Sequence, residues 1–243
     1  MRRVSDLHHR WENFAFSDLT HIFGPGKTVI LSPHQDDESL GCGGAIALLC
    51  QAGPPPMIIF ITDGAGSHPS SASTPPAALR SLREAEAREA LHRLGHHDDS
   101  AVAFLRLPDT ATPISGPGFD TAVERILTLA HDCATICAPW RHDPHHDHQA
   151  TDRMARAAAT HAGWRHISYP VWGWTLPPDT ELDDSSTNGW RLDISPVLPS
   201  KRHAIAAHRS QLGLNITDDP NGFELPSDLI HIFQRPFEVY SRQ

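Results

Sequence analysis

The 243-residue sequence lacks long hydrophobic runs, and no stretch approaches the roughly 18 apolar residues that a membrane span needs. We therefore expect no membrane span. The first residues, MRRVSDLHHRWENF, carry charge but no apolar core, so we expect no signal peptide. Basic residues are also few: 20 Lys and Arg stand against 29 Asp and Glu, for a formal net charge of −9. This balance argues against a nucleic-acid-binding role.

Two common site signatures are missing as well. No CxxC pair occurs among the cysteines, which are Cys42, Cys50, Cys133 and Cys137. We interpret them as reduced, mostly buried thiols of a cytoplasmic protein rather than as disulfides or ligands. Gly41, Gly43 and Gly44 form neither a GxGxxG fingerprint nor a P-loop, so we assign them to close packing of a helix on a sheet.

What the sequence does contain is an alternation of short apolar segments and helical patterns. Residues 28–33, 56–62, 101–107 and 135–140 are apolar on both faces and predict buried strands of a parallel sheet. Helical periodicity separates or follows them, at about residues 79–94, 120–130 and 148–162. This order predicts an α/β fold of the Rossmann-like, doubly wound type, with a mostly parallel sheet and helices on both faces.

The remaining segments frame one domain. We expect a single domain over residues 1–243, with an N-terminal extension over residues 1–26 and a C-terminal elaboration over about residues 170–243. Residues 67–77 form a small, Pro-rich loop for which the sequence offers few anchors, and we expect this loop to be mobile.

Polar residues gather where the predicted strands end. SPHQDDESLGCGG (residues 32–44) follows the first strand, TDG (residues 62–64) ends the second, and RHDPHHDHQA (residues 141–150) follows the fourth. The carboxyl ends of parallel strands lie at one edge of the sheet, which is where doubly wound folds bind ligands. The sequence therefore predicts a ligand site at this edge.

The residue types at this edge suggest a metal ion. A strand end rarely tolerates a histidine and three consecutive carboxylates without a positive partner. A hydrolytic zinc site uses about three protein ligands and leaves one position for water. A tight turn can bring His34 and Asp37 together, and His148 can supply a third ligand. A carboxylate left over beside the metal can accept a proton from water.

The same carboxylates also suit a helix N-terminus, because a helix is expected from about Ser39. We assign Glu38 to such a cap or to a structural hydrogen bond. For Asp36 and Asp37, which lie beside His34, we favour metal chemistry.

These segments of the sequence resemble the motifs of a known family. PHQDDESLGCGG (residues 33–44) resembles the PHPDDExLGxGG signature of the PIG-L/LmbE-like zinc-dependent N-deacetylases. Weaker likenesses follow in the family's order, at residues 62–68, 83–95, 107–109, 144–148 and 201–211. Two positions depart from the pattern, since Gln35 and His146 each replace a proline of the family's motifs. The second departure leaves open whether His145 or His146 faces the metal.

The resemblance implies roles for matching residues. His34, Asp37 and His148 would bind one zinc ion per chain, or another divalent metal in its place. Asp36 would be the general base. His145 would assist the developing oxyanion or the leaving amine.

The resemblance also implies supporting roles. Asp147 would orient a histidine ligand through a hydrogen bond. Arg83 and Asp109 would contact the substrate, although both also suit structural ion pairs. Trp172 and Trp174 suit either sugar stacking or core packing, and the sequence leaves both open.

The implied activity is metal-dependent hydrolysis of an N-acetyl or related N-acyl group from an amino sugar or its conjugate. On the same zinc scaffold, a hydratase of a small unsaturated acid is an alternative. A non-enzymatic, Rossmann-like ligand-binding module and an inactive scaffold are further alternatives. The sequence does not define the substrate or the oligomeric state.

Overall fold

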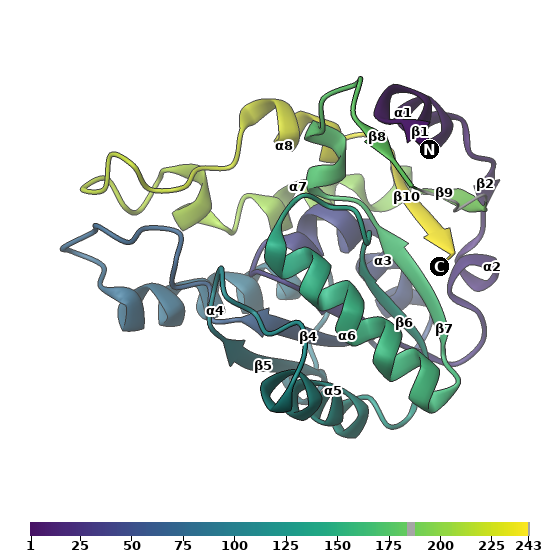
Figure 1. Cartoon of the computed structure of the whole chain (residues 1–243), viewed down its shortest axis with the longest axis horizontal. Helices are drawn as coiled ribbons and strands as arrows, with labels where there is room; N and C mark the ends of the chain where they lie inside the picture. The colour runs from purple at the N-terminus through teal and green to yellow at the C-terminus, as the bar shows by residue number, and fades with distance from the viewer. Residues whose placement is uncertain (184–187, 243) are drawn as a thin grey trace.

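The computed structural model describes residues 1–183 and 188–242, and most of its strands form one eight-stranded sheet (Figure 1). The strands are β1 (Arg2–Arg3), β2 (Phe16–Ser17), β3 (Lys27–Ser32), β4 (Met57–Thr62), β5 (Val102–Leu107), β6 (Cys133–Pro139), β7 (Arg165–Tyr169), β8 (Glu181–Leu182), β9 (Gly189–Asp193) and β10 (Phe237–Arg242). The helices are α1 (Val4–Asn13), α2 (Leu19–Phe23), α3 (Asp37–Ala52), α4 (Pro76–Arg93), α5 (Pro117–Leu129), α6 (His146–Ala162), α7 (Leu198–Ile205) and α8 (Ser227–Phe233). Short 3₁₀ turns are η1 (Asp99–Ala101), η2 (Trp172–Thr175), η3 (Ser195–Val197) and η4 (Arg209–Leu212).

The sheet has the order β2-β9-β10-β7-β6-β3-β4-β5. Its five strands from β7 to β5 are parallel to their neighbours, whereas β10 runs antiparallel to both β7 and β9. The chain builds outward from β3 in one direction and then returns to place β6 on its other side. The predicted mostly parallel, doubly wound sheet is confirmed, and each of the four predicted strands overlaps an observed one.

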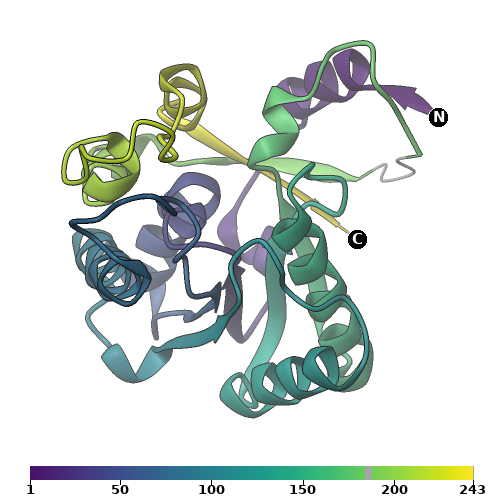
Figure 2. The same ribbon diagram turned by 60° about the vertical axis from the view of Figure 1, so that its left-hand side comes forward.

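Two apolar cores cover the two faces of the sheet. Ile30 of β3 packs into one core with residues of α3 and α4, while its neighbours Val29 and Leu31 pack into the other with residues of α5 and α6. Figures 1 and 2 show α5 and α6 together on one face, and α3 on the other. Alternation of buried side chains along a strand is what covered faces require. The expected helices on both faces are thus confirmed.

The two ends of the chain contribute to the same sheet. Within residues 1–26, Leu7, Trp11, Ile22 and Phe23 are buried in the core that α3 shares. Strand β2 pairs with β9, so the N-terminal and C-terminal segments form one edge together. Among the described residues, no helix is both long enough and apolar enough to cross a membrane.

Helix α3 approaches its neighbours closely through its glycines. A Cβ atom on Gly41 would collide with the ring of Tyr169 in β7, and one on Gly44 would collide with the side chain of Ile194. The predicted helix-to-sheet packing is therefore confirmed for Gly41. The other close contact involves the C-terminal part of the chain.

A buried carboxylate from β10 holds the middle of α3. Glu238 accepts hydrogen bonds from the backbone N–H groups of Gly44 (2.7 Å) and Ala45 (2.9 Å). Lys201 of α7 pairs with the same carboxylate at 2.6 Å. Because a buried charge needs a partner, the lysine and the helix N–H groups together satisfy Glu238. Helix α3 is thus tied to the last strand.

The loop over residues 67–77 is anchored, so the expectation of few anchors is wrong. Asp218 accepts hydrogen bonds from Ser71 Oγ (2.7 Å) and the Ser73 N–H (2.8 Å), and Asp219 accepts one from the Ser70 N–H (2.8 Å). Figures 1 and 2 show this loop beside the loop that contains these acidic residues. The anchors lie far along the chain, where sequence proximity cannot indicate them.

Candidate metal and catalytic site

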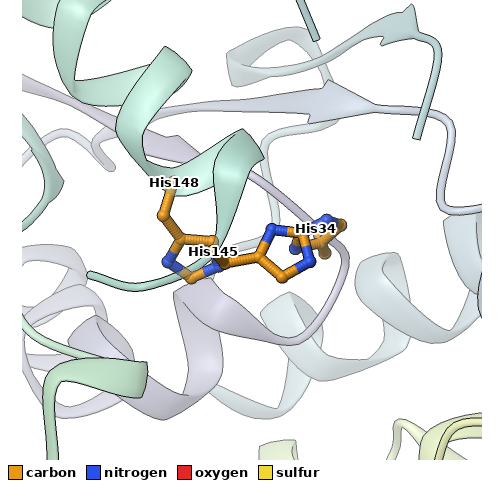
Figure 3. A group of neighbouring side chains, drawn as sticks. All are labelled: His34, His145 and His148. Carbon is orange, nitrogen blue, oxygen red and sulfur yellow. The ribbon is translucent and has the colours of Figure 1, made fainter. Parts of the chain in front are cut away.

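The segments predicted to follow the first and fourth strands meet in one pocket of about 370 Å³, whereas residues 62–64 do not line it. Strands β3 and β6 are parallel neighbours, so the residues that follow them emerge at the same edge of the sheet. His34 follows β3, while His145 and His148 lie between β6 and the first turn of α6. Figure 3 shows the three imidazole rings gathered at this point. After β5 the chain returns to add β6 on the other side of β3, and the pocket lies at this switch in strand order.

The three histidines are close enough to share a metal ion. Their donor atoms lie within 4.8 Å of one another. His145 caps α6, and its Nδ1 accepts the backbone N–H of Asp147 at 3.2 Å. Since a backbone N–H can only donate, the proton of the neutral His145 ring is on Nε2. Burial lowers the pKa of His145 to about 4, with the positive charges of His34 and His148 acting in the same direction.

Asp37 lies between two of these histidines. Its Oδ2 is 3.2 Å from His34 Nδ1 and 3.2 Å from His148 Nε2. Burial acts to raise the pKa of Asp37, but the adjacent imidazoles of His148 and His34 hold it well below its usual range. The structure thus brings the three expected ligands together, with His34 and His148 both beside Asp37 Oδ2.

His148 is oriented as metal-binding histidines are. Its Nδ1 lies 2.9 Å from Asp143 Oδ2, and its buried Nε2 has no hydrogen-bond partner in the described part of the chain, although Asp37 is near. Burial lowers the pKa of His148, but Asp37 and Asp143 outweigh this effect and raise it to about 9. A carboxylate that fixes one ring nitrogen leaves the other free to coordinate a cation. The site attracts positive charge, as a metal site must.

Asp143 contacts the histidine cluster, and the sequence reasoning gave it no role. It is fully buried, and besides His148 it accepts hydrogen bonds from the backbone N–H groups of Val171 (3.1 Å) and Gly173. One carboxylate therefore fixes both a histidine of the cluster and the turn η2. The available signal was its place in the same HDPHHDH segment as His148.

The other ring nitrogen of His34 faces two carboxylates. Its Nε2 lies 3.1 Å from Asp147 Oδ2 and 3.3 Å from Asp109 Oδ1, and these three residues form a second group close enough to hold a metal ion. Burial lowers the pKa of His34, but bonds to Asp109, Asp147 and Asp37 raise it well above its ordinary value. Asp147 also accepts the N–H of Thr110, a β-branched residue held at φ +66° on the pocket wall. Such a backbone is strained and is typical of functional sites.

Asp36 lines the pocket beside this cluster and is only 5% exposed. Its Oδ2 lies 3.5 Å from Arg83 Nη2. Burial raises the pKa of Asp36, and the charge of Arg83 only partly opposes this. The guanidinium of Arg83 also donates to the carbonyl oxygens of Gly64 and Gln35, each at 3.1 Å. Gln35, which replaces the family's proline, donates to Thr62 O at 3.0 Å and so links two strand ends.

Glu38 forms the structural hydrogen bonds that the sequence predicted. Its carboxylate accepts the N–H of Asp36 at 3.0 Å and the hydroxyl of Ser39 at 2.7 Å. It also lies 3.1 Å from His208 Nε2. These buried bonds fix the turn between β3 and α3, where Asp36 and Asp37 are located.

The sequence left open which of two adjacent histidines faces the cluster and whether two tryptophans lie in the pocket or in the core. The structure shows the position of each. The ring of His145 lies in the histidine cluster, whereas the Nε2 of the exposed His146 is 2.9 Å from Thr112 O. Trp172 lines the pocket, whereas Trp174 packs into the core against Trp11, with ring centroids 4.7 Å apart.

These features define a Rossmann-like α/β protein with a candidate metal centre at the carboxyl edge of its sheet. The family model described as GlcNAc-PI de-N-acetylase, PIG-L, matches residues 29–159, which include every cluster residue described above. The chain belongs to this family, and it is an enzyme of the N-deacetylase class. The resemblance inferred from the sequence is thereby confirmed.

Individual relatives agree with this placement. The chain is 23% identical over 220 residues to a probable N-acetyl-alpha-D-glucosaminyl L-malate deacetylase 2 of Bacillus anthracis, covering 87% of this chain and 94% of the relative. It is 27% identical over 191 residues to a diacetylchitobiose deacetylase of Thermococcus kodakarensis, covering 76% of this chain and 70% of the relative. The solved structure of the N,N'-diacetylchitobiose deacetylase from Pyrococcus horikoshii has a similar fold, with a TM-score of 0.66, 20% identity, and coverage of 100% of this chain and 94% of that one.

Proposed function

We propose that this protein removes an N-acetyl or related N-acyl group from an amino sugar or its conjugate, using one zinc ion. The names of the relatives support this substrate class, since both are deacetylases of N-acetylated sugar compounds. The family also favours deacetylation over a hydratase reaction or a non-enzymatic ligand-binding role. The observation that carries the proposal is a buried carboxylate, Asp36, that lines the same pocket as the histidine cluster. Unlike Asp37, which contacts His148, Asp36 is paired with Arg83 and is therefore available as a base.

The cluster fits a zinc ion in one particular way. His34 Nδ1, Asp37 Oδ2 and His148 Nε2 would be the donors, because His148 Nε2 has no other partner among the described residues and Asp37 Oδ2 is 3.2 Å from both nitrogens. His34 Nε2 faces Asp147, which leaves Nδ1 for the metal. Nitrogen and carboxylate donors of this kind suit zinc, although another divalent metal remains the alternative. When bound, the zinc ion supplies Lewis-acid activation of the amide carbonyl and of a water molecule.

Asp36 and His145 then perform the proton chemistry. Asp36 accepts a proton from the attacking water, and its raised pKa brings it closer to neutral pH, where a base works best. His145 donates from Nε2–H to the oxygen that becomes negative. The proton held by Asp36 is then available to the departing amine, which is a poor leaving group without one.

Supporting features complete the proposal. Asp147 holds His34, and Arg83 and Asp109 line the pocket where sugar hydroxyls would lie. We treat residues 1–243 as one catalytic domain. We also propose a cytoplasmic location, because all four cysteines are free thiols.

Acetate release tests the function directly. Zinc-loaded protein should release acetate and a free amine in equal amounts from at least one member of a panel of N-acetyl amino sugars and their glycosides. Turnover of a small unsaturated acid without acetate would instead establish the hydratase alternative.

The two adjacent histidines should differ sharply in mutational effect. His145→Ala should lower kcat by about 10²-fold, because it removes the N–H donor beside the cluster, whereas His146→Ala should change kcat little. Metal content, measured alongside, should stay unchanged in both variants. Loss of metal from His145→Ala would show that His145 is a ligand, and a larger kcat loss in His146→Ala would reverse the assignment.

Asp143 should control metal affinity from outside the ligand set. Asp143→Asn should weaken zinc binding by about 10- to 100-fold, because His148 loses the carboxylate that fixes its ring. Competition with a chelator of known affinity measures this change. Asp152→Asn is the matched control, since Asp152 is a buried carboxylate on α6, the helix of His148, and pairs with Arg156 instead. Equal affinities in the two variants would refute the role of Asp143.

A further inference from the structure

The pocket has two halves that come from different parts of the chain. The proposed catalytic residues all lie within residues 29–159, the segment that matches the family model. The opposite wall comes from beyond that segment, and Trp172, Gln211, Phe223 and Leu225 form it. The proposed catalytic residues and this wall therefore come from separate parts of the sequence. The wall can determine which group the substrate carries in addition to its amide.

This wall is mostly apolar. The rings of Trp172 and Phe223 meet edge to face, with centroids 5.9 Å apart and an interplanar angle of 71°. Leu225 is buried beside them. Two partly covered aromatic rings and a leucine present a surface that gains free energy when an apolar group covers it.

The wall is also held in place. The backbone N–H of Phe223 donates to Ser67 O at 2.8 Å, and that of Leu225 donates to Gln211 O at 2.8 Å. The N–H groups on both sides of Trp172 donate to Asp143, the carboxylate that also holds His148. A wall fixed in this way is pre-organised, so a ligand loses little affinity in ordering it.

The charges around the pocket exclude one class of substrate. Among the described residues that line it, Arg83 is the only lysine or arginine, and it already contacts Asp36 and two carbonyl oxygens. Asp37 is a proposed metal ligand, so Asp36 and Asp109 supply the negative charge of the lining that a substrate would meet. An anionic group on the substrate would find no free arginine or lysine and would be repelled by these carboxylates.

We propose that Trp172, Phe223 and Leu225 form a subsite for a neutral, apolar aglycone. The preferred substrate is then an N-acylated amino sugar joined to an aryl or alkyl group, rather than to an anionic group. This proposal rests on the proposed deacetylase function and names its substrate class. It separates this chain from relatives whose names specify an anionic partner such as malate.

Three matched substrates test the subsite. They are N-acetylglucosamine, its β-phenyl glycoside and its β-(4-carboxyphenyl) glycoside, of which the last two differ by one carboxylate group. For zinc-loaded protein, we expect kcat/KM for the phenyl glycoside to exceed that for the free sugar by about tenfold or more, within the range that a hydrophobic contact supplies. The carboxyphenyl glycoside should fall at least tenfold below the phenyl glycoside. Equal kcat/KM values for the phenyl and carboxyphenyl glycosides would overturn the proposal.

Variants of the wall connect this preference to its residues. Phe223→Ala and Trp172→Ala should each reduce the ratio of phenyl-glycoside to free-sugar kcat/KM toward one, and Phe223→Leu should retain part of it. Leu214→Ala is the control, because Leu214 is a 57% exposed side chain on the same loop as Phe223 and does not line the pocket. An unchanged ratio in both alanine variants would overturn the assignment.

Failure of the proposed function would give a different result. If none of the three sugars releases acetate, the subsite can still be tested with phenyl β-glucoside, which carries no amide. Calorimetry should show binding to the wild-type protein at least tenfold tighter than to Phe223→Ala. Equal binding would overturn the subsite independently of any reaction.

Discussion

Asparagine in place of Asp36 should lower kcat by about 10³-fold while the protein keeps its metal, because the amide has the shape of the carboxylate but accepts no proton. Asp36 lies in the pocket beside the cluster, and its carboxylate forms an ion pair with Arg83 rather than with a histidine. The substitution therefore removes a base and no ligand. Acetate release and elemental analysis on the same sample measure the two effects.

Two further results decide what the Asp36→Asn loss means. A thermal unfolding midpoint close to that of the wild type would show that Arg83 tolerates the loss of its partner. Full activity with full metal content would mean that Asp36 is not the base, and loss of metal would place Asp36 among the ligands.

Removing a proposed ligand should instead abolish both metal and activity. His34→Ala and Asp37→Ala should each purify with almost no zinc, because a site of about three protein ligands loses one of them. Turnover should fall below detection. Adding zinc to chelator-treated protein should restore the wild type and leave both variants inactive.

The control for this experiment is His146→Ala. Its ring lies next to the cluster in sequence but contacts Thr112 O instead, so its metal content should match the wild type. An unchanged zinc load in both His34→Ala and Asp37→Ala would exclude this metal site.

The sequence was sufficient for the centre of the fold and for the convergence of the site. Continuous apolar strands such as β3 and β4 require a sheet covered on both faces, and parallel strands end at one edge. His34 and His148 therefore had to emerge near each other once β3 and β6 were neighbours. Local pattern and global fold agree in this part of the chain.

Other features depended on partners that are distant in sequence. Asp143 accepts bonds from Val171 and Gly173, which follow β7, and a carboxylate in a histidine-rich loop does not indicate such partners by itself. Trp172 and Trp174 are only two residues apart, but the turn η2 sends one to the pocket and the other to the core.

The sequence pattern also did not predict the C-terminal strands. Strands β9 and β10 mix polar and apolar residues and pair antiparallel, unlike the continuous apolar strands at the centre. Phe223 lies in a stretch that reads only as a turn-rich loop. Long-range pairing, rather than local preference, positions each of them.

The hydrogen bonds between Glu238 and α3 have a consequence for how the enzyme folds. The residues that hold each other, Gly44 and Glu238, are separated by 194 positions, so the helix that follows Asp36 is secured by one of the last strands to be synthesised. Long-range contacts of this kind form late and slow the folding of a domain. Residues 33–44 are synthesised long before β10, but the middle of α3 gains its bonds to Glu238 only when β10 joins the sheet.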